Sequence, residues 1–68
     1  MELKQGQRVY TVNGKTNKVD PWNYDGIFTI ADETIVHLVK GKKQCYLPMR
    51  CVFASKEKAL EVANMRSQ

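Results

Sequence analysis

The chain has 68 residues, 43% of them hydrophobic and 26% charged, and its 11 basic and 7 acidic side chains give a formal charge of +4. These values are those of an ordinary globular domain and exclude a disordered chain. Because the chain is too short for a dinucleotide-binding fold or a (β/α)₈ barrel, we expect residues 1–68 to form one small domain.

The first half of the chain contains two predicted strands separated by a long loop. Residues 8–12 are rich in β-branched and aromatic side chains and predict a strand, which ends at the turn dipeptide Asn13-Gly14. The polar segment 15–23 contains Pro21, which cannot donate a hydrogen bond to a central ladder, so we expect a loop. A second strand is predicted over 24–30, with apolar side chains on both faces.

The second half predicts three further strands and a helix. A tight turn at Asp32-Glu33 leads to a strand over 34–39, and Gly41 marks the hairpin to a strand over 44–47. Pro48 interrupts that strand, and a short fifth strand is predicted over 51–53.

A short amphipathic helix is predicted at the C-terminal end, over 56–65. Ser55 is a suitable N-cap, although the full capping box is absent. Three turns are too few for a stable isolated helix, so we expect it to dock over an open end or edge of the sheet. Its apolar stripe consists of Ala59, Leu60, Val62, Ala63 and Met65.

Five short strands followed by one helix predict a mainly β fold, a five-stranded antiparallel barrel with a C-terminal α-helix. Closure of the sheet would remove the exposed edges that promote aggregation. The segments Gly6-Gln7-Arg8-Val9-Tyr10 and Asp25-Gly26-Ile27-Phe28-Thr29-Ile30 resemble the first strands of SH3-like barrels, including the KOW and Tudor families. The resemblance covers residues 6–53 and implies an SH3-like barrel.

A second resemblance is to the plasmid-encoded type of dihydrofolate reductase, itself an SH3-like barrel. Its "G-D-R-V" strand is similar to Gly6-Gln7-Arg8-Val9, and Trp22 precedes Gly26-Ile27 as in that family. The segment 44–48 departs from the family's "V-Q-I-Y-P" strand, because Lys43 and Cys45 replace its Val and Ile and Leu47 is inserted. The resemblance therefore bears on the fold and not on the reaction.

Charge is segregated along the chain and suggests a binding surface. Residues 1–19 carry a net +3, residues 20–33 carry −4 and residues 40–58 carry +5. A basic hairpin with nearby aromatic rings is typical of nucleic-acid binding, whereas a solvated hairpin and core tyrosines are the structural alternative. The candidate nucleic-acid-binding residues are Lys40, Lys42, Lys43, Arg50 and Tyr46.

Two further aromatic residues are candidates for binding a protein partner. Trp22 lies in the polar segment, where a tryptophan either covers one end of a barrel or anchors a partner. Tyr24 follows it closely and is the second candidate.

No catalytic or metal site is predicted. His37 is the one histidine, and no serine or cysteine nucleophile is visibly paired with it. Cys45 and Cys51 lack the spacing of a zinc site; a buried thiol and a disulfide are both open. We expect a non-enzymatic protein without a cofactor.

The sequence thus predicts a small binding module that associates with nucleic acid through its basic hairpin. The alternative is a protein-interaction or self-associating accessory protein of the phage or mobile-element type, whose acidic and basic segments are complementary. Residues 1–6 have no apolar stretch typical of a signal peptide, and no apolar run approaches the roughly 18 residues of a membrane helix. We therefore expect a cytoplasmic protein that does not contact membranes.

Overall fold

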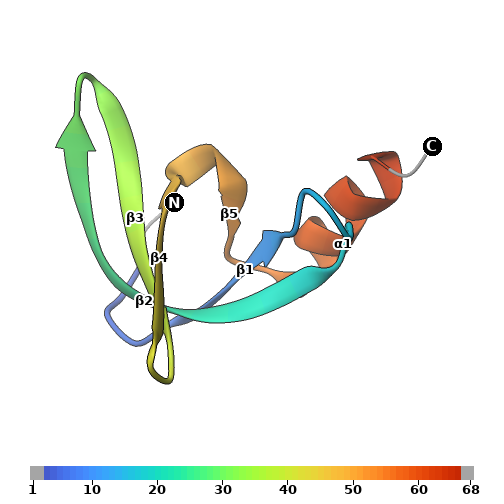
Figure 1. Cartoon of the computed structure of the whole chain (residues 1–68), viewed down its shortest axis with the longest axis horizontal. Helices are drawn as coiled ribbons and strands as arrows, with labels where there is room; N and C mark the ends of the chain where they lie inside the picture. The colour runs from blue at the N-terminus through green and yellow to red at the C-terminus, as the bar shows by residue number, and fades with distance from the viewer. Residues whose placement is uncertain (1–2, 67–68) are drawn as a thin grey trace.

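The computed structural model of the chain describes residues 3–66 and shows a mainly β fold (Figure 1). Five antiparallel strands form one sheet in the order β4-β3-β2-β1-β5. A 3₁₀ turn, η1, lies between β4 and β5, and a helix follows. The elements are β1 (Arg8–Val12), β2 (Val19–Ile30), β3 (Glu33–Lys40), β4 (Lys43–Pro48), η1 (Met49–Cys51), β5 (Val52–Phe53) and α1 (Lys56–Arg66).

The sheet is open, whereas the sequence predicted a closed barrel. β4 and β5 are its two edge strands, and no ladder joins them within residues 3–66. β5 has only two residues, and both pair with β1. What the structure shows is therefore a five-stranded open sheet with one C-terminal helix.

The long strand β2 bends the sheet. Its first part, from Val19 to Asn23, pairs with β1, and its second part, from Asn23 to Ile30, pairs with β3. The register shifts between Tyr24 and Gly26, where Asp25 forms a β-bulge. Figure 1 shows β2 curving from the side of the helix to the tip of the β2–β3 hairpin.

The prediction of a loop over 15–23 was wrong from Val19 onward. Pro21 fits into β2 because it faces Tyr10 at a position where neither strand exchanges ladder hydrogen bonds. Pairs with and without hydrogen bonds alternate along the β1–β2 ladder. The hydrogen bond that Asn13 N donates to Lys18 O, at 2.8 Å, identifies Tyr10 and Pro21 as a pair without them. On its other side, β2 meets β3 only from Asn23 onward, so no neighbouring strand requires an N–H from Pro21.

Two tight turns connect the hairpins. The β2–β3 turn lies at Ala31 and Asp32, one residue earlier than predicted, and Glu33 is already paired with Ile30. Both turn residues have positive φ, 49° and 66°, which is typical of a type I′ turn. In the β3–β4 hairpin Gly41 has a φ of 61°, a conformation that glycine adopts without steric cost.

The core lies on the inner face of the bent sheet. Its buried residues come from four strands, and Val9, Val36 and Leu38 have no exposed surface. The other two members of the cluster are Tyr24 and Val52. Half-buried side chains that include Trp22, Cys45 and Leu47 pack around them.

The helix α1 begins at the predicted residue and extends one residue further than predicted. Ser55 caps it as expected, because its Oγ accepts a hydrogen bond from the N–H of Lys58 at 3.2 Å. Ala59 and Ala63, one turn apart, are buried against β1, β5 and the start of β2. The predicted apolar stripe is narrower than expected, since Leu60 and Met65 are exposed.

Candidate functional site

The most distinctive surface of the molecule is the outer face of the β2–β3–β4 part of the sheet. Side chains alternate along β3, so Val36 and Leu38 point into the core while Ile35, His37 and Val39 point outward. The residues paired with these three on β2 and β4 point outward with them. We call this surface the outer face. Its apolar and aromatic members are Phe28, Ile30, Ile35, His37, Val39, Tyr46 and Pro48.

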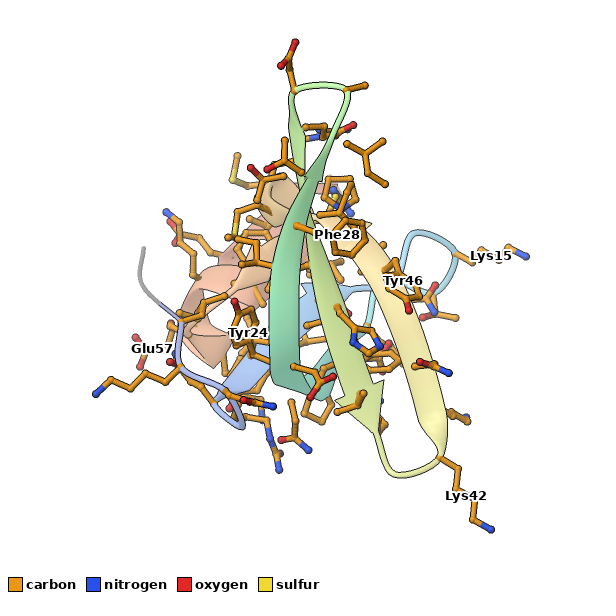
Figure 2. The ribbon with its side chains drawn as sticks, turned by 90° about the vertical axis from the view of Figure 1, so that its left-hand side faces the viewer. Lys15, Tyr24, Phe28, Lys42, Tyr46 and Glu57 are labelled. Atoms are coloured by element: carbon orange, nitrogen blue, oxygen red, sulfur yellow. The ribbon has the colours of Figure 1, made fainter. Side chains whose placement is uncertain are left out.

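Three rings at the centre of the outer face contact one another. Tyr46 lies opposite His37 in the register, and their rings stack with centroids 4.7 Å apart and planes at 13°. Phe28 meets Tyr46 edge-on, at 5.9 Å and 68°. Figure 2 shows Phe28 and Tyr46 side by side in front of the sheet. The ring cluster therefore contains one residue from each of β2, β3 and β4.

Polar neighbours hold the His37 ring in place. Its Nδ1 lies 3.0 Å from Oδ2 of Asp25, which the β-bulge of β2 brings next to β3. Its Nε2 lies 3.1 Å from Oε1 of Gln44 on β4. With a polar partner at each nitrogen, the ring has a defined orientation and provides a flat support for Tyr46.

The outer face exposes large apolar side chains to solvent. Ile30 is 58% exposed, Tyr46 57% and Phe28 39%. At the end of the face near the β2–β3 turn, the Arg50 side chain forms an ion pair with Glu33. A contiguous apolar surface with a charged rim is typical of a site that binds another molecule.

The structure separates the predicted nucleic-acid-binding residues. Lys42 lies at the tip of the β3–β4 hairpin (Figure 2), and Lys43 begins β4. Arg50 lies beyond the other end of β4, a strand that spans roughly 17 Å at about 3.4 Å per residue, and is paired with Glu33. The basic segment 40–58 is therefore not one continuous patch.

The two sides of β4 also separate the lysines from Tyr46. Lys40 and Lys43 face one another across the β3–β4 ladder and alternate to the inner face, whereas Tyr46 is on the outer face. The ammonium of Lys40 lies 4.5 Å from the centroid of the Trp22 ring, a cation–π contact. This arrangement does not place the predicted lysines beside the Tyr46 ring.

Of the predicted partner-binding residues, Tyr24 lies in the core and Trp22 packs at its edge. Trp22 is half-buried in β2, and its Nε1–H donates a hydrogen bond to Oγ1 of the buried Thr11 at 3.0 Å. Tyr24 is a core residue with 8% of its surface exposed. Neither ring is presented to a partner as the sequence suggested, because the loop expected around Trp22 is a strand.

The remaining reactive side chains form no assembled site in the part of the chain that the structure describes. Cys45 and Cys51 are both free thiols, so the disulfide alternative is not realised. Residues 3–66 contain no group of three side chains arranged to hold a metal ion, and no pocket forms among them. The outer face remains the surface with the clearest capacity for binding.

Sequence reasoning missed the outer face as a site. The one indication in the sequence was that the strand containing Phe28 and Ile30 has apolar side chains on both of its faces. Joining them to Tyr46 requires the register of two ladders, and the β-bulge at Asp25 changes which residues share a face.

Comparisons with protein-family models, curated proteins and solved structures found no match. Within residues 3–66 the single helix, Lys56–Arg66, is too short to cross a membrane.

Proposed function

We propose that this chain is a small, non-enzymatic binding module that docks a protein partner on its outer face. The observation that carries the proposal is the exposure of Phe28, Ile30 and Tyr46 on the same face of the sheet. A surface of this kind is stabilised when a partner covers it and removes its apolar area from water.

The proposal includes an SH3-like architecture, with the open sheet as the wall of a small barrel. Its support is the antiparallel order β4-β3-β2-β1-β5 and the long β2, which bends and serves both halves of the sheet. The core between the two halves is consistent with such a wall. In this arrangement the outer face lies on the outside of the wall, where a partner has access to it.

Charge favours a protein over a nucleic acid as the occupant of the outer face. Asp25 lies beside His37, and Glu33 and Asp32 lie at the end near the β2–β3 turn. These carboxylates would repel phosphate, and Arg50, the nearest arginine, is already paired with Glu33. A partner that presents apolar side chains with a few basic groups at the rim matches both features.

The first test removes one outer-face ring at a time. We expect Phe28→Ser and Tyr46→Ser to weaken partner binding by roughly 30-fold each, because aromatic side chains at an interface centre commonly contribute 2 kcal/mol or more. The measurement is the amount of each protein captured from a nuclease-treated cell lysate by the immobilised chain.

The matched control is Leu60→Ser on α1, whose side chain is 44% exposed and lies outside the outer face. This variant is expected to capture partners as the wild-type chain does, and far-ultraviolet circular dichroism checks that all variants are folded. Equal capture by the two ring variants, the control and the wild-type chain would contradict the proposed function.

A second candidate function, association with nucleic acid, is favoured by the tip of the β3–β4 hairpin. Lys42 and Lys43 are exposed, and no carboxylate within residues 3–66 forms an ion pair with either of them. These two ammonium groups, one on the turn and one at the start of β4, can contact a phosphate backbone, and the Lys40 ammonium lies over the Trp22 ring.

This candidate predicts salt-dependent binding to a fluorescent oligonucleotide. We expect Lys42→Ala and Lys43→Ala each to lower the slope of log K against log salt by about 1, because each lysine displaces counterions from phosphate. Lys15→Ala, in the β1–β2 connection, is the control. Fluorescence anisotropy between low and moderate salt measures the slopes, and an absence of binding at low salt would refute the candidate.

A further inference from the structure

Among residues 3–66, no strand pairs with the outer edge of β4, which leaves one row of its backbone groups without a strand partner. The turn between Lys40 and Lys43 has two residues, so Lys40 and Lys43 form a hydrogen-bonded pair of the ladder. Along β3 and β4, hydrogen-bonded pairs then alternate with pairs that exchange no hydrogen bonds. The residues between the hydrogen-bonded pairs direct their backbone groups away from β3, toward the free edge. They are Gln44, Tyr46 and Pro48.

Proline restricts how a second strand can align with this edge. Pro48 offers a carbonyl but no N–H, so a strand that requires a donor there leaves an acceptor unsatisfied. Gln44 and Tyr46 each offer both groups. An antiparallel copy of β4 satisfies the N–H and C=O of both residues when Gln44 lies opposite Tyr46 of the partner subunit. By the two-fold symmetry, Tyr46 then lies opposite Gln44 of the partner subunit.

We propose that the chain forms a two-fold symmetric dimer in which the β4 edges pair in this register. Four backbone hydrogen bonds join the two copies, and the two five-stranded sheets become one continuous sheet of ten strands. On the symmetry axis, Cys45 faces Cys45 of the partner subunit at a pair that exchanges no hydrogen bonds.

The side chains fit a second copy in this register. On the outer side, Tyr46 lies diagonally across from Tyr46 of the partner subunit, within the reach of aromatic rings across a ladder. The two outer faces therefore join into one apolar surface. On the inner side, Lys43 faces Leu47 of the partner subunit, so no like charges lie directly opposite one another.

Charge also favours a second copy over an unrelated strand. The antiparallel arrangement brings the Lys42 end of one β3–β4 hairpin beside the opposite end of the other subunit's sheet. That end carries Asp32, Glu33 and Arg50. The ion pair between Arg50 and Glu33 leaves Asp32 as a carboxylate with no ion pair among residues 3–66, and the basic tip of each copy approaches this end of the other.

This inference goes beyond the proposed function, because it concerns the strand edge and not the outer face. Edge pairing uses the backbone of Tyr46 and leaves its ring exposed. The two proposals can fail separately, since Phe28→Ser removes an outer-face ring two strands away from the β4 edge and is expected to dimerise as the wild-type chain does.

Sedimentation equilibrium of the full chain tests the dimer. The expected wild-type mass at high micromolar concentration is twice the 7.8 kDa of one chain. Gln44→Pro removes an N–H that points away from β3, so the variant retains its own β3–β4 ladder but loses hydrogen bonds at the edge. We expect its dimer dissociation constant to rise at least about tenfold.

Gln44→Ala is the matched control, because it loses the same contact with His37 as Gln44→Pro but retains the N–H. It is expected to dimerise like the wild-type chain, and circular dichroism checks the fold of both variants. A wild-type chain that remains a monomer, or a dimer that Gln44→Pro leaves intact, would overturn the inference.

Oxidation tests the register. With added copper–phenanthroline, two Cys45 thiols on the axis lose two protons and two electrons to the oxidant and form one disulfide. We expect Cys51→Ser, which retains Cys45, to give a covalent dimer on a non-reducing gel, whereas Cys45→Ser gives none. Crosslinking through Cys51 alone, or none in either variant, would show that the proposed register is wrong.

Discussion

Leu38→Ala is expected to lower the free energy of unfolding by about 2–5 kcal/mol, because it removes a fully buried side chain and leaves a cavity. Leu38 lies in β3 and faces Tyr24 on one side and Cys45 on the other, at the centre of the inner face. Small domains are stable by only about 5–15 kcal/mol, so this one change removes much of the margin. Urea denaturation followed by circular dichroism measures the loss.

Leu60→Ala provides the control for this experiment, since it makes the same chemical change at a side chain that is 44% exposed. We expect its unfolding free energy to remain within about 0.5 kcal/mol of the wild-type value. Equal losses in the two variants would mean that the inner face of the sheet is not the core.

The hydrogen bond between Trp22 and Thr11 is expected to show a large coupling in a double-mutant cycle. Thr11→Val retains the shape of the side chain but leaves the Trp22 Nε1–H without its acceptor, at a cost of about 1–3 kcal/mol. Trp22→Phe removes the donor. The double variant should lose less stability than the two single variants together, since the second change finds the bond already broken.

Thermal unfolding followed by circular dichroism suits this cycle, because it does not depend on tryptophan fluorescence. Thr29→Val, at an exposed position of β2, makes the same substitution without an indole partner and is expected to have an effect within about 0.5 kcal/mol. Strictly additive losses at Thr11 and Trp22 would show that the bond contributes nothing to stability.

Local patterns identified most of the elements. The β-branched and aromatic residues of Arg8–Val12 and the hairpin around Gly41 predicted β1, β3 and β4 to within one residue at each end. Ser55 marked the start of the helix, since an N-cap hydroxyl acts within a single turn. These features depend on residues close in sequence, which is why they can be predicted from sequence.

The start of β2 was not predictable in the same way. The polar residues around Pro21 are typical of a loop, and they form a strand because β1 supplies the partner and β3 is absent on the other side. Trp22, which was expected in a loop, therefore lies in β2 at the edge of the core. A residue's role thus depended on a neighbour that its own segment does not specify.

The binding surface shows the same division between local and long-range information. Spacing along the chain was enough to predict β1, β3, β4, the helix and the concentration of charge in 40–58, because these features depend on residues close in sequence. Long-range packing places Arg50 away from the lysines and brings Phe28, His37 and Tyr46 together. Side chains from three strands become neighbours only through the register of their ladders and the bulge at Asp25, which depend on packing across the whole sheet.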